Sequence, residues 1–484
     1  MRTRLITLLG STAVVYLLLL IPDNTSLPFA PASSTPFAWN KDQRWQNLQA
    51  QFEFTRLLPS NEKDSILKIH QARLGERYNR LLQSDSASFS TTATEFLNAF
   101  FDAAPVVASA GDTEWFNGLY NAGRAHIKHK SRKLNMNDAH NRSLVYSLLY
   151  GLRAATEEVL LQQDSIIFNP VQHVTHEPSA TPSAVIRGIT VHSGDLLVSR
   201  GGAEVSAFIS RGNDFPGNFS HVALLHVDEA GNASLIEAHI EKGVALATVD
   251  EYLEDKKLRF MVLRPRADLP QLIRNPQLPH QAAQTAFEES KRRHIPYDFK
   301  MNFYDSSAMF CSEVGSYAYR KNGIQLWQAV STISSTGMAN WLSAFGVENF
   351  VTQMPSDLEY DPQLSIVAEW YDPEALFKDH LDNAVMDALY EQADKGLKIS
   401  YNTWLLPVAR VIKGYSFIQN KLGYPGIIPE GMNAAQALKN NTFTRLYQKT
   451  RADAYEKANR FIAEKKYRPP YWQLVNMART SVPN

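Results

Sequence analysis

The residue best suited to covalent chemistry is the single cysteine of the chain, Cys311. It lies in the run DSSAMFCSEVGSYAYRKNG (305–323), where Asp305 or Ser306 can cap a helix and Gly323 can end it. We therefore predict that Cys311 lies in the first turns of a helix. Amides at a helix N-terminus favour a thiolate and can bind an oxyanion, which suits a nucleophile. The alternative is a small buried side chain, a common state of free cysteines.

A nucleophilic thiol needs a base, and the segment SHVALLHV (220–227) contains a candidate. Period-two alternation places His221 on one face of this predicted strand and His226 on the other. His221 begins the strand next to a Gly-Asn loop, where its side chain can reach a cleft. A neutral imidazole near pH 7 can take a thiol proton and return it to a leaving group. We assign His221 as the candidate base, with a structural histidine as the alternative.

A third residue should orient this imidazole, and the segment SLIEAHI (234–240) contains two candidates, Glu237 and His239, on one face. If the loop between the two strands has three or five residues, that face is also the face of His221, whereas a two-residue turn reverses the answer. A glutamate in an apolar strand needs a partner such as an imidazolium. The alternative is a glutamate at the rim of the sheet in solvent.

Composition limits what kind of protein this is. A chain of 484 residues with 44% hydrophobic and 20% charged residues is globular and long enough for two or three structural units. Lys and Arg total 49, as do Asp and Glu, so no excess of cations indicates a nucleic-acid partner. One cysteine excludes an intramolecular disulfide and a cysteine-rich zinc site, and the histidines show no metal-binding spacing. We expect neither a cofactor nor a metal.

The N-terminus has the layout of an export signal. Arg2 and Arg4 precede an uncharged apolar stretch at 5–21, and small residues at 30–32 offer a cleavage site. The stretch is long for a signal core and short for a membrane span, so removal and retention as a membrane anchor both stay open. Either outcome places the rest of the chain outside the cytoplasm. For a bacterial source, this predicts the periplasm or cell envelope, with contact to the inner membrane through residues 5–21 if the segment is kept.

Hydrophobic patterning divides the chain into five parts. We predict a signal or anchor plus tether at 1–36, a helical region at 37–167, a linker at 168–185, an α+β domain at 186–372 and a second helical region at 373–484. The strands expected in the α+β domain are DLLVS, SHVALLHV, SLIEAHI, VALATV, RFMVL and QLSIVAEWY.

Several motifs occur in one order along the chain. They are SGDLLVSRGG (193–202), FSHVA (219–223), IEA (236–238) with GV (243–244), PYDF (296–299) and FCSE (310–313). This set resembles the circularly permuted papain-like amidases, which are related to the NlpC-type peptidoglycan peptidases, and within them the YiiX/YaeF-like subgroup. The strand histidine precedes the cysteine helix here, whereas unpermuted papain has the cysteine first. The resemblance covers about 193–372 and leaves both helical regions unassigned.

The resemblance implies a fold and a set of roles. It implies a small antiparallel sheet or barrel with the cysteine helix packed against it. Cys311 would be the nucleophile, His221 the general base and acid, and Glu237 the orienting carboxylate. His239 is the reserve for the third role, because the related lecithin retinol acyltransferase group uses a second histidine on the adjacent strand. Tyr297 and Asp298 precede the cysteine helix and are candidates for lining the substrate cleft, with a simple turn as the alternative.

Three functional hypotheses follow. The first is an extracytoplasmic cysteine hydrolase that cleaves amide or peptide bonds through an acyl-enzyme, with cell-wall peptidoglycan peptides as substrate. The second is a lipid-directed acyltransferase or thioesterase of the lecithin retinol acyltransferase-like branch, indicated by the N-terminal segment and by apolar stretches at 106–107 and 404–406. The third is a non-catalytic envelope scaffold, and an intact set of Cys, His and Glu argues against it.

Overall fold

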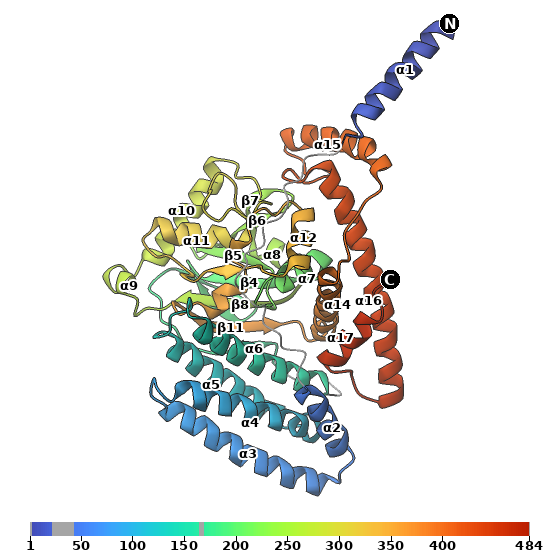
Figure 1. The fold of residues 1–484 in the computed structure, drawn as a ribbon. Helices are drawn as coiled ribbons and strands as arrows, with labels where there is room; N and C mark the ends of the chain where they lie inside the picture. Colours follow the sequence, from blue (N-terminus) through green and yellow to red (C-terminus); the bar gives the residue numbers. More distant parts are fainter. Residues whose placement is uncertain (1, 22–42, 164–168, 484) are drawn as a thin grey trace.

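The structure is a computed structural model that describes residues 2–21, 43–163 and 169–483 (Figure 1). The first helix, α1 (Arg2–Leu18), extends away from the body of the molecule. In the described part of the chain, no helix combines the length and the hydropathy needed to cross a membrane. The predicted tether and the candidate cleavage residues at 30–32 lie outside the described residues.

The centre of the molecule is an antiparallel sheet of seven strands in the order β1-β11-β8-β4-β5-β6-β7. This confirms the predicted α+β class, since the cysteine-bearing helix packs on the sheet and helical regions flank it. Its strands are β1 (Val171–His173), β4 (Leu196–Gly201), β5 (His221–Val227), β6 (Ala233–His239), β7 (Gly243–Thr248), β8 (Lys257–Pro265) and β11 (Leu364–Tyr371). Two small hairpin-like pairs lie outside it, β2 (Ser183–Ile186) with β3 (Ile189–His192), and β9 (Ser331–Thr332) with β10 (Val351–Thr352).

Both faces of the sheet are buried, as its near-continuous apolar strands require. Val222 and Leu224 of β5 belong to a core shared with α10 (Leu278–Arg292) and α11 (Cys311–Lys321). Ala223 and Leu225 face a second core that includes Tyr252 of α8 (Val249–Glu254). Helix α11 lies close to β4, because a Cβ on Gly315 would stand 2.4 Å from a methyl group of Leu196.

Five N-terminal helices form a separate core beside the sheet. They are α2 (Arg44–Arg56), α3 (Ser60–Gln83), α4 (Phe89–Ala110), α5 (Thr113–Ser131) and α6 (Ala139–Leu161). Buried ion pairs join this bundle to the central domain: Arg124 with Glu369 of β11, Glu157 with Arg259 of β8, and Arg153 with Glu359 of α13. Moving the bundle would separate these pairs and leave buried charges without partners, which costs several kcal/mol. The pairs therefore fix the position of the bundle against the central domain.

The C-terminal region continues around the other side of the domain (Figure 1). Its helices are α14 (Leu376–Asp394), the 3-10 turn η1 (Thr403–Leu405), α15 (Leu406–Lys421), α16 (Ala434–Lys465) and α17 (Tyr471–Arg479). Helices α14, α16 and α17 share a core with α7 (Glu204–Arg211) and α12 (Thr336–Ala344) of the central domain, whereas α15 packs on the start of α16. The remaining short helices are α9 (Pro270–Arg274) and α13 (Asp357–Tyr360).

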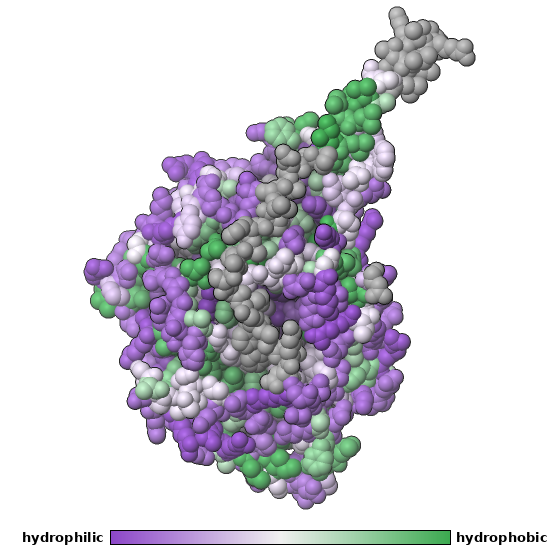
Figure 2. Space-filling view, in the orientation of Figure 1, coloured by the Kyte–Doolittle hydropathy of each residue, from purple (hydrophilic) through white to green (hydrophobic). Residues whose placement is uncertain are grey.

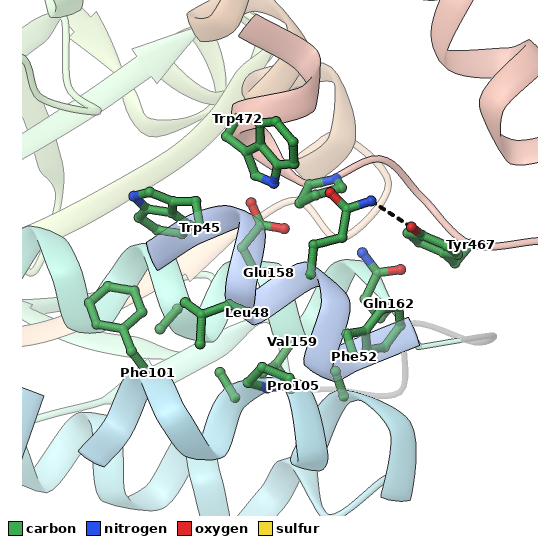
Figure 3. A pocket seen from close by; sticks show the side chains of 15 residues that line it. Trp45, Leu48, Phe52, Phe101, Pro105, Glu158, Val159, Gln162, Tyr467 and Trp472 are labelled. Carbon is green, nitrogen blue, oxygen red and sulfur yellow. Dashed lines mark hydrogen bonds between the residues drawn. The ribbon is translucent and has the colours of Figure 1, made fainter. Parts of the chain in front are cut away.

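The two helical regions also meet each other. A small apolar pocket of about 70 Å³ lies where α2, α4 and α6 face residues 467–472, which include the start of α17 (Figure 3). Trp45, Phe52 and Trp472 line it, and Gln49 donates a hydrogen bond of 2.7 Å to the hydroxyl of Tyr467 at its edge. Its lining residues come from the two flanks and are separate from the region of Cys311.

The structure differs from the sequence-based expectation in two places. Part of the predicted linker at 168–185 is ordered as β1, an edge strand paired with β11, and as the beginning of β2. Three residues can join a sheet through backbone hydrogen bonds alone, so neither prolines nearby nor missing periodicity exclude this. The cysteine helix begins at Cys311 rather than near Ser307, because the Asp305 carboxylate accepts the Ser307 amide in a turn and Phe310 takes the N-cap position.

Candidate active site

Cys311 is the first residue of α11, which places it closer to the helix N-terminus than we predicted. The first turn of this helix is held by a neighbouring segment. The Ser312 hydroxyl donates to the Gln353 carbonyl (2.7 Å), and the Ser316 hydroxyl donates to the side-chain oxygen of Gln353 (3.0 Å). Gln353 is itself buried. The cysteine therefore lies on a rigid element whose N-terminal amides point toward the site, as the binding of an anion requires.

The thiol is buried and protonated in this state. Only 4% of Cys311 is exposed, and its Sγ lies 3.7 Å from the Ser220 carbonyl, to which it donates. Burial raises the pKa of the Cys311 thiol to about 11, while the backbone of Val222 and the first amides of α11 offset part of this rise. We expected the helix N-terminus to produce a thiolate. Loss of hydration outweighs the helix field here, so the resting nucleophile is a neutral thiol.

His221, Glu237 and His239 form one hydrogen-bonded group. The Glu237 carboxylate bonds His221 Nε2 at 2.6 Å through one oxygen and His239 Nε2 at 3.0 Å through the other. Strand β5 ends at Val227 and β6 begins at Ala233, so the turn between them is odd in length, and Ala223 pairs with Glu237. This is the condition under which we expected the three side chains to share a face.

The carboxylate in this group is ionised. Glu237 is buried to 2% exposure, and although burial opposes ionisation, the hydrogen bonds from His221 and His239 hold the pKa of its carboxyl far below the usual range. Burial lowers the pKa of His221, and Glu237 opposes this shift. His221 is therefore neutral at pH 7, as a general base must be. Because its Nε2 is engaged by Glu237, Nδ1 is the nitrogen left to exchange a proton with a thiol.

The two candidates for the third role differ in their contacts. Glu237 contacts His221 directly, whereas His239 contacts only the second oxygen of Glu237, with 5.8 Å between the two imidazole centroids. The arrangement places His239 behind the carboxylate, where its hydrogen bond fixes the orientation of Glu237.

The thiol lies at the start of β5, beside the backbone of the residue that precedes His221. Sγ contacts the carbonyl of Ser220, the residue next to His221, and no thiol–imidazole hydrogen bond is present among the residues that the structure describes. By alternation, His221 leaves the strand on the face of Ala223, while α11 packs on the opposite face. Proton transfer therefore requires the cysteine side chain to turn from the Ser220 carbonyl toward the imidazole.

The two candidate cleft residues lie where the sequence placed them. Tyr297 forms a bridge with Met309, two residues before Cys311, and burial raises its pKa, with the nearby thiol as the second cause. The Asp298 carboxylate accepts the amides of Lys300 (2.8 Å) and Asn302 (2.6 Å), so it also builds the turn that we named as the alternative. Both residues line the same pocket as Cys311.

Glu313, two residues after Cys311 on α11, is an unusual neighbour of the site. It is fully buried, and neither carboxyl oxygen has a hydrogen-bond partner within the described part of the chain. Burial, followed by the charge of Asp298, raises its pKa to about 9. Glu313 is therefore a neutral acid at pH 7, which explains how an unpaired carboxyl is tolerated beneath the site.

Cys311 opens into a pocket of about 220 Å³ whose walls are mainly apolar. The apolar wall residues include Val205, Phe208, Ile240, Phe299, Met301, Phe310, Leu342, Phe345, Val347, Met354, Met432 and Phe443. Glu204, Glu241, Asp298 and Asn440 are polar members of the lining. The central domain supplies one side, and residues 429–443 of the C-terminal region supply the other.

Sequence reasoning missed this C-terminal wall. Phe443 lies on α16 and is buried, and nothing in its local pattern distinguishes a pocket wall from an ordinary core position. No sequence pattern indicated a role for Gln353 either, because this residue belongs to no motif. No group of three or more His, Cys, Asp or Glu side chains in the described ranges is arranged to hold a metal ion.

The comparison with known families agrees with the fold and the order of motifs. Residues 190–368 match the permuted papain-like amidase enzymes of the YaeF/YiiX, C92 family. No curated protein matches the chain. The central part of the chain therefore matches a permuted papain-like amidase family, which confirms the predicted resemblance and supports a cysteine amidase-type hydrolase. The matched segment contains Cys311, His221 and Glu237, while both helical flanks lie outside it.

Proposed function

We propose that the protein hydrolyses or transfers acyl groups through a covalent intermediate on Cys311. Substrate binding moves the thiol from the Ser220 carbonyl to His221 Nδ1, which takes its proton as Sγ attacks the substrate carbonyl. The first amides of α11 stabilise the oxyanion. Protonated His221, held by Glu237, then gives the proton to the leaving amine or alcohol, and water releases the acyl group from Cys311 by the same steps.

We further propose that the acyl group is apolar, which favours the second of the two enzymatic hypotheses. The observation that carries this choice is the lining of the Cys311 pocket, where Phe208, Phe345 and Phe443 approach one another with ring centroids 4.9 to 5.6 Å apart. An apolar chain entering this pocket gains about 0.8 kcal/mol per buried methylene, while a polar peptide side chain loses hydration there.

The cell-wall hypothesis also has one supporting feature. A groove of about 650 Å³ lies beside the pocket and is lined by polar residues such as Glu241, Lys242, His294 and Glu430, which suits a stem peptide. Export is proposed on the basis of Arg2, Arg4 and the apolar α1. Under this hypothesis, the protein acts outside the cytoplasm on peptidoglycan peptides.

The dependence of kcat/KM on the length of the acyl chain distinguishes these two substrate classes. We would assay p-nitroanilides and thioesters of acyl groups from acetyl to dodecanoyl, with isolated muropeptides in parallel. For an apolar acyl pocket, kcat/KM rises by up to about fourfold per methylene until the pocket is filled. Val347→Phe narrows the pocket and should reduce activity on long chains at least tenfold while sparing acetyl substrates. The matched control Val351→Phe lies on β10, is 51% exposed and does not line the pocket.

Each part of the proposal can fail separately. Product formation by Cys311→Ala would refute the nucleophile. Equal turnover of acetyl and decanoyl substrates by the wild type would refute the acyl pocket and leave the cysteine mechanism standing. Release of peptides from muropeptides, with no turnover of acyl substrates, would establish the cell-wall hypothesis instead.

A further inference from the structure

An exposed apolar stripe runs along the outer face of η1 and α15. Its members recur at steps of three and four residues: Trp404, Val408, Val411, Tyr415, Ile418 and Leu422. Each is between 54% and 69% exposed. The opposite face of α15 is docked, since Leu406 and Ala409 pack on Ala434 and Ala435 of α16. The helix is therefore held in place with its apolar side outward, which is the reverse of an ordinary surface helix.

The apolar helix α1 lies beside this α15 stripe. The hydroxyl of Tyr16 donates to the Trp404 carbonyl at 2.7 Å, and the Arg410 guanidinium donates to the Leu19 carbonyl at 2.9 Å. Leu17 and Leu18 of α1 are themselves about 60% exposed. Figure 2 shows hydrophobic colour over the described end of α1, where it meets the part of the body that Figure 1 labels α15. Two apolar surfaces thus adjoin at one end of the molecule.

The segment that carries the stripe has cations and no acidic residue, while Glu241 and Glu430 line the groove beside it. Residues 401–429 contain Arg410, Lys413 and Lys421 and no Asp or Glu. Trp404 and Tyr415 are side-chain types that favour the boundary between hydrocarbon and water. Face-to-face contact with a second copy would bring these cations together, whereas the phosphates of a lipid surface would neutralise them. The combination of an apolar stripe, interfacial aromatics and flanking cations is typical of helices that lie in a bilayer interface.

We propose that the α15 stripe docks on the surface of an anionic lipid bilayer, with α15 in the interface plane and α1 beside it. This docking does not depend on the proposed function, but it has a consequence for it. Phe417, Lys421 and Tyr424 line the groove of about 650 Å³ next to the stripe, and Glu241 lines both this groove and the Cys311 pocket. A docked molecule therefore holds this groove, which adjoins the Cys311 pocket at Glu241, near the lipid surface.

Vesicle flotation tests the docking with the full chain. We would compare phosphatidylcholine vesicles with vesicles that also contain phosphatidylglycerol. The wild type should float, more strongly with phosphatidylglycerol and less strongly in high salt. Val411→Glu/Ile418→Glu should lower the partition coefficient at least tenfold. The matched control Ile69→Glu/Leu82→Glu changes two exposed apolar residues of α3 on the N-terminal bundle and should float like the wild type.

A site-specific probe separates the stripe from α1. Because Cys311 is the only cysteine, Tyr415→Cys in a Cys311→Ser background takes one environment-sensitive fluorophore. Its emission should shift to the blue on vesicles, and the same label on Leu82→Cys should not shift. No shift at 415 would overturn the proposal even if the protein floats through α1. If the emission is already shifted to the blue without vesicles, another part of the protein covers the stripe, and the proposal is overturned. A dimer abolished by Val411→Glu/Ile418→Glu, without flotation, would overturn it in favour of a second copy.

Discussion

The charge state of two buried glutamates leads to the sharpest prediction. Glu237 and Glu313 are both buried near the site, yet Glu237 is ionised between two histidines while Glu313 is a neutral, unpaired acid. Glutamine has nearly the shape of either side chain and is always neutral. Glu237→Gln therefore removes a charge, whereas Glu313→Gln below pH 9 replaces one neutral group with another.

The size of the effect follows from the contacts. In Glu237→Gln the amide has one acceptor and one donor group, so it can accept from only one of the two imidazoles that Glu237 bonds at 2.6 and 3.0 Å. Losing one hydrogen bond to a charged group costs about 1.5–3 kcal/mol. If this free energy is lost in the transition state, kcat/KM falls by about 10- to 100-fold. Glu313→Gln should change kcat/KM at pH 7 by less than about threefold.

The pH profile provides a second readout. Glu237 raises the pKa of His221 against the lowering effect of burial. Without the carboxylate, His221 is harder to protonate, so the acidic limb of kcat/KM should move to lower pH in Glu237→Gln while the plateau falls. The acyl-substrate assay and NMR titration of the His221 ring measure both changes. Activity of Glu237→Gln within threefold of wild type, or an equal loss in Glu313→Gln, would refute the reasoning.

Further predictions concern stability, the thiol and the second histidine. The pKa of Glu313 is raised to about 9, so wild-type stability should fall as pH rises from about 4.5 through 9, and Glu313→Gln should remove that dependence in thermal unfolding scans. Alkylation of Cys311 by iodoacetamide should accelerate with pH toward its pKa of about 11; a plateau near pH 7 would contradict the buried neutral thiol. His239→Ala should lower kcat/KM by less than Glu237→Gln and shift the pH profile, with His239→Gln restoring part of both; an unchanged profile would exclude a positioning role. Arg259→Met leaves Glu157 and Asp379 short of a partner and should cost about 3–5 kcal/mol in denaturant unfolding, against under about 1 kcal/mol for Arg132→Met, whose ion pair with Asp268 is partly exposed to solvent.

Much of the domain could be predicted from the sequence because the signals are local. Short β-type runs bounded by turn residues located the six longer strands of the sheet, and the order of His221, Glu237 and Cys311 indicated the permuted papain-like family. The turn between β5 and β6 consists of the residues 228–232, and its odd length was enough to place Glu237 on the face of His221. These features depend on neighbours in the chain, which a sequence displays directly.

The rest was decided by tertiary structure. The pKa of Cys311 depends on how much water the surrounding elements exclude, and a helix N-terminus alone predicted the opposite state. Phe443 became a wall of the Cys311 pocket only because α16 folds back onto the central domain. At 404–406 the sequence showed an apolar stretch, but only the packing of α15 on α16 showed that Trp404 faces outward and Leu406 inward. Burial and long-range proximity are properties of the folded chain as a whole. Residue types and their spacing therefore determined which catalytic groups the chain has. Packing determined the charge states of those groups, the shape of the Cys311 pocket and the apolar surface that stays exposed.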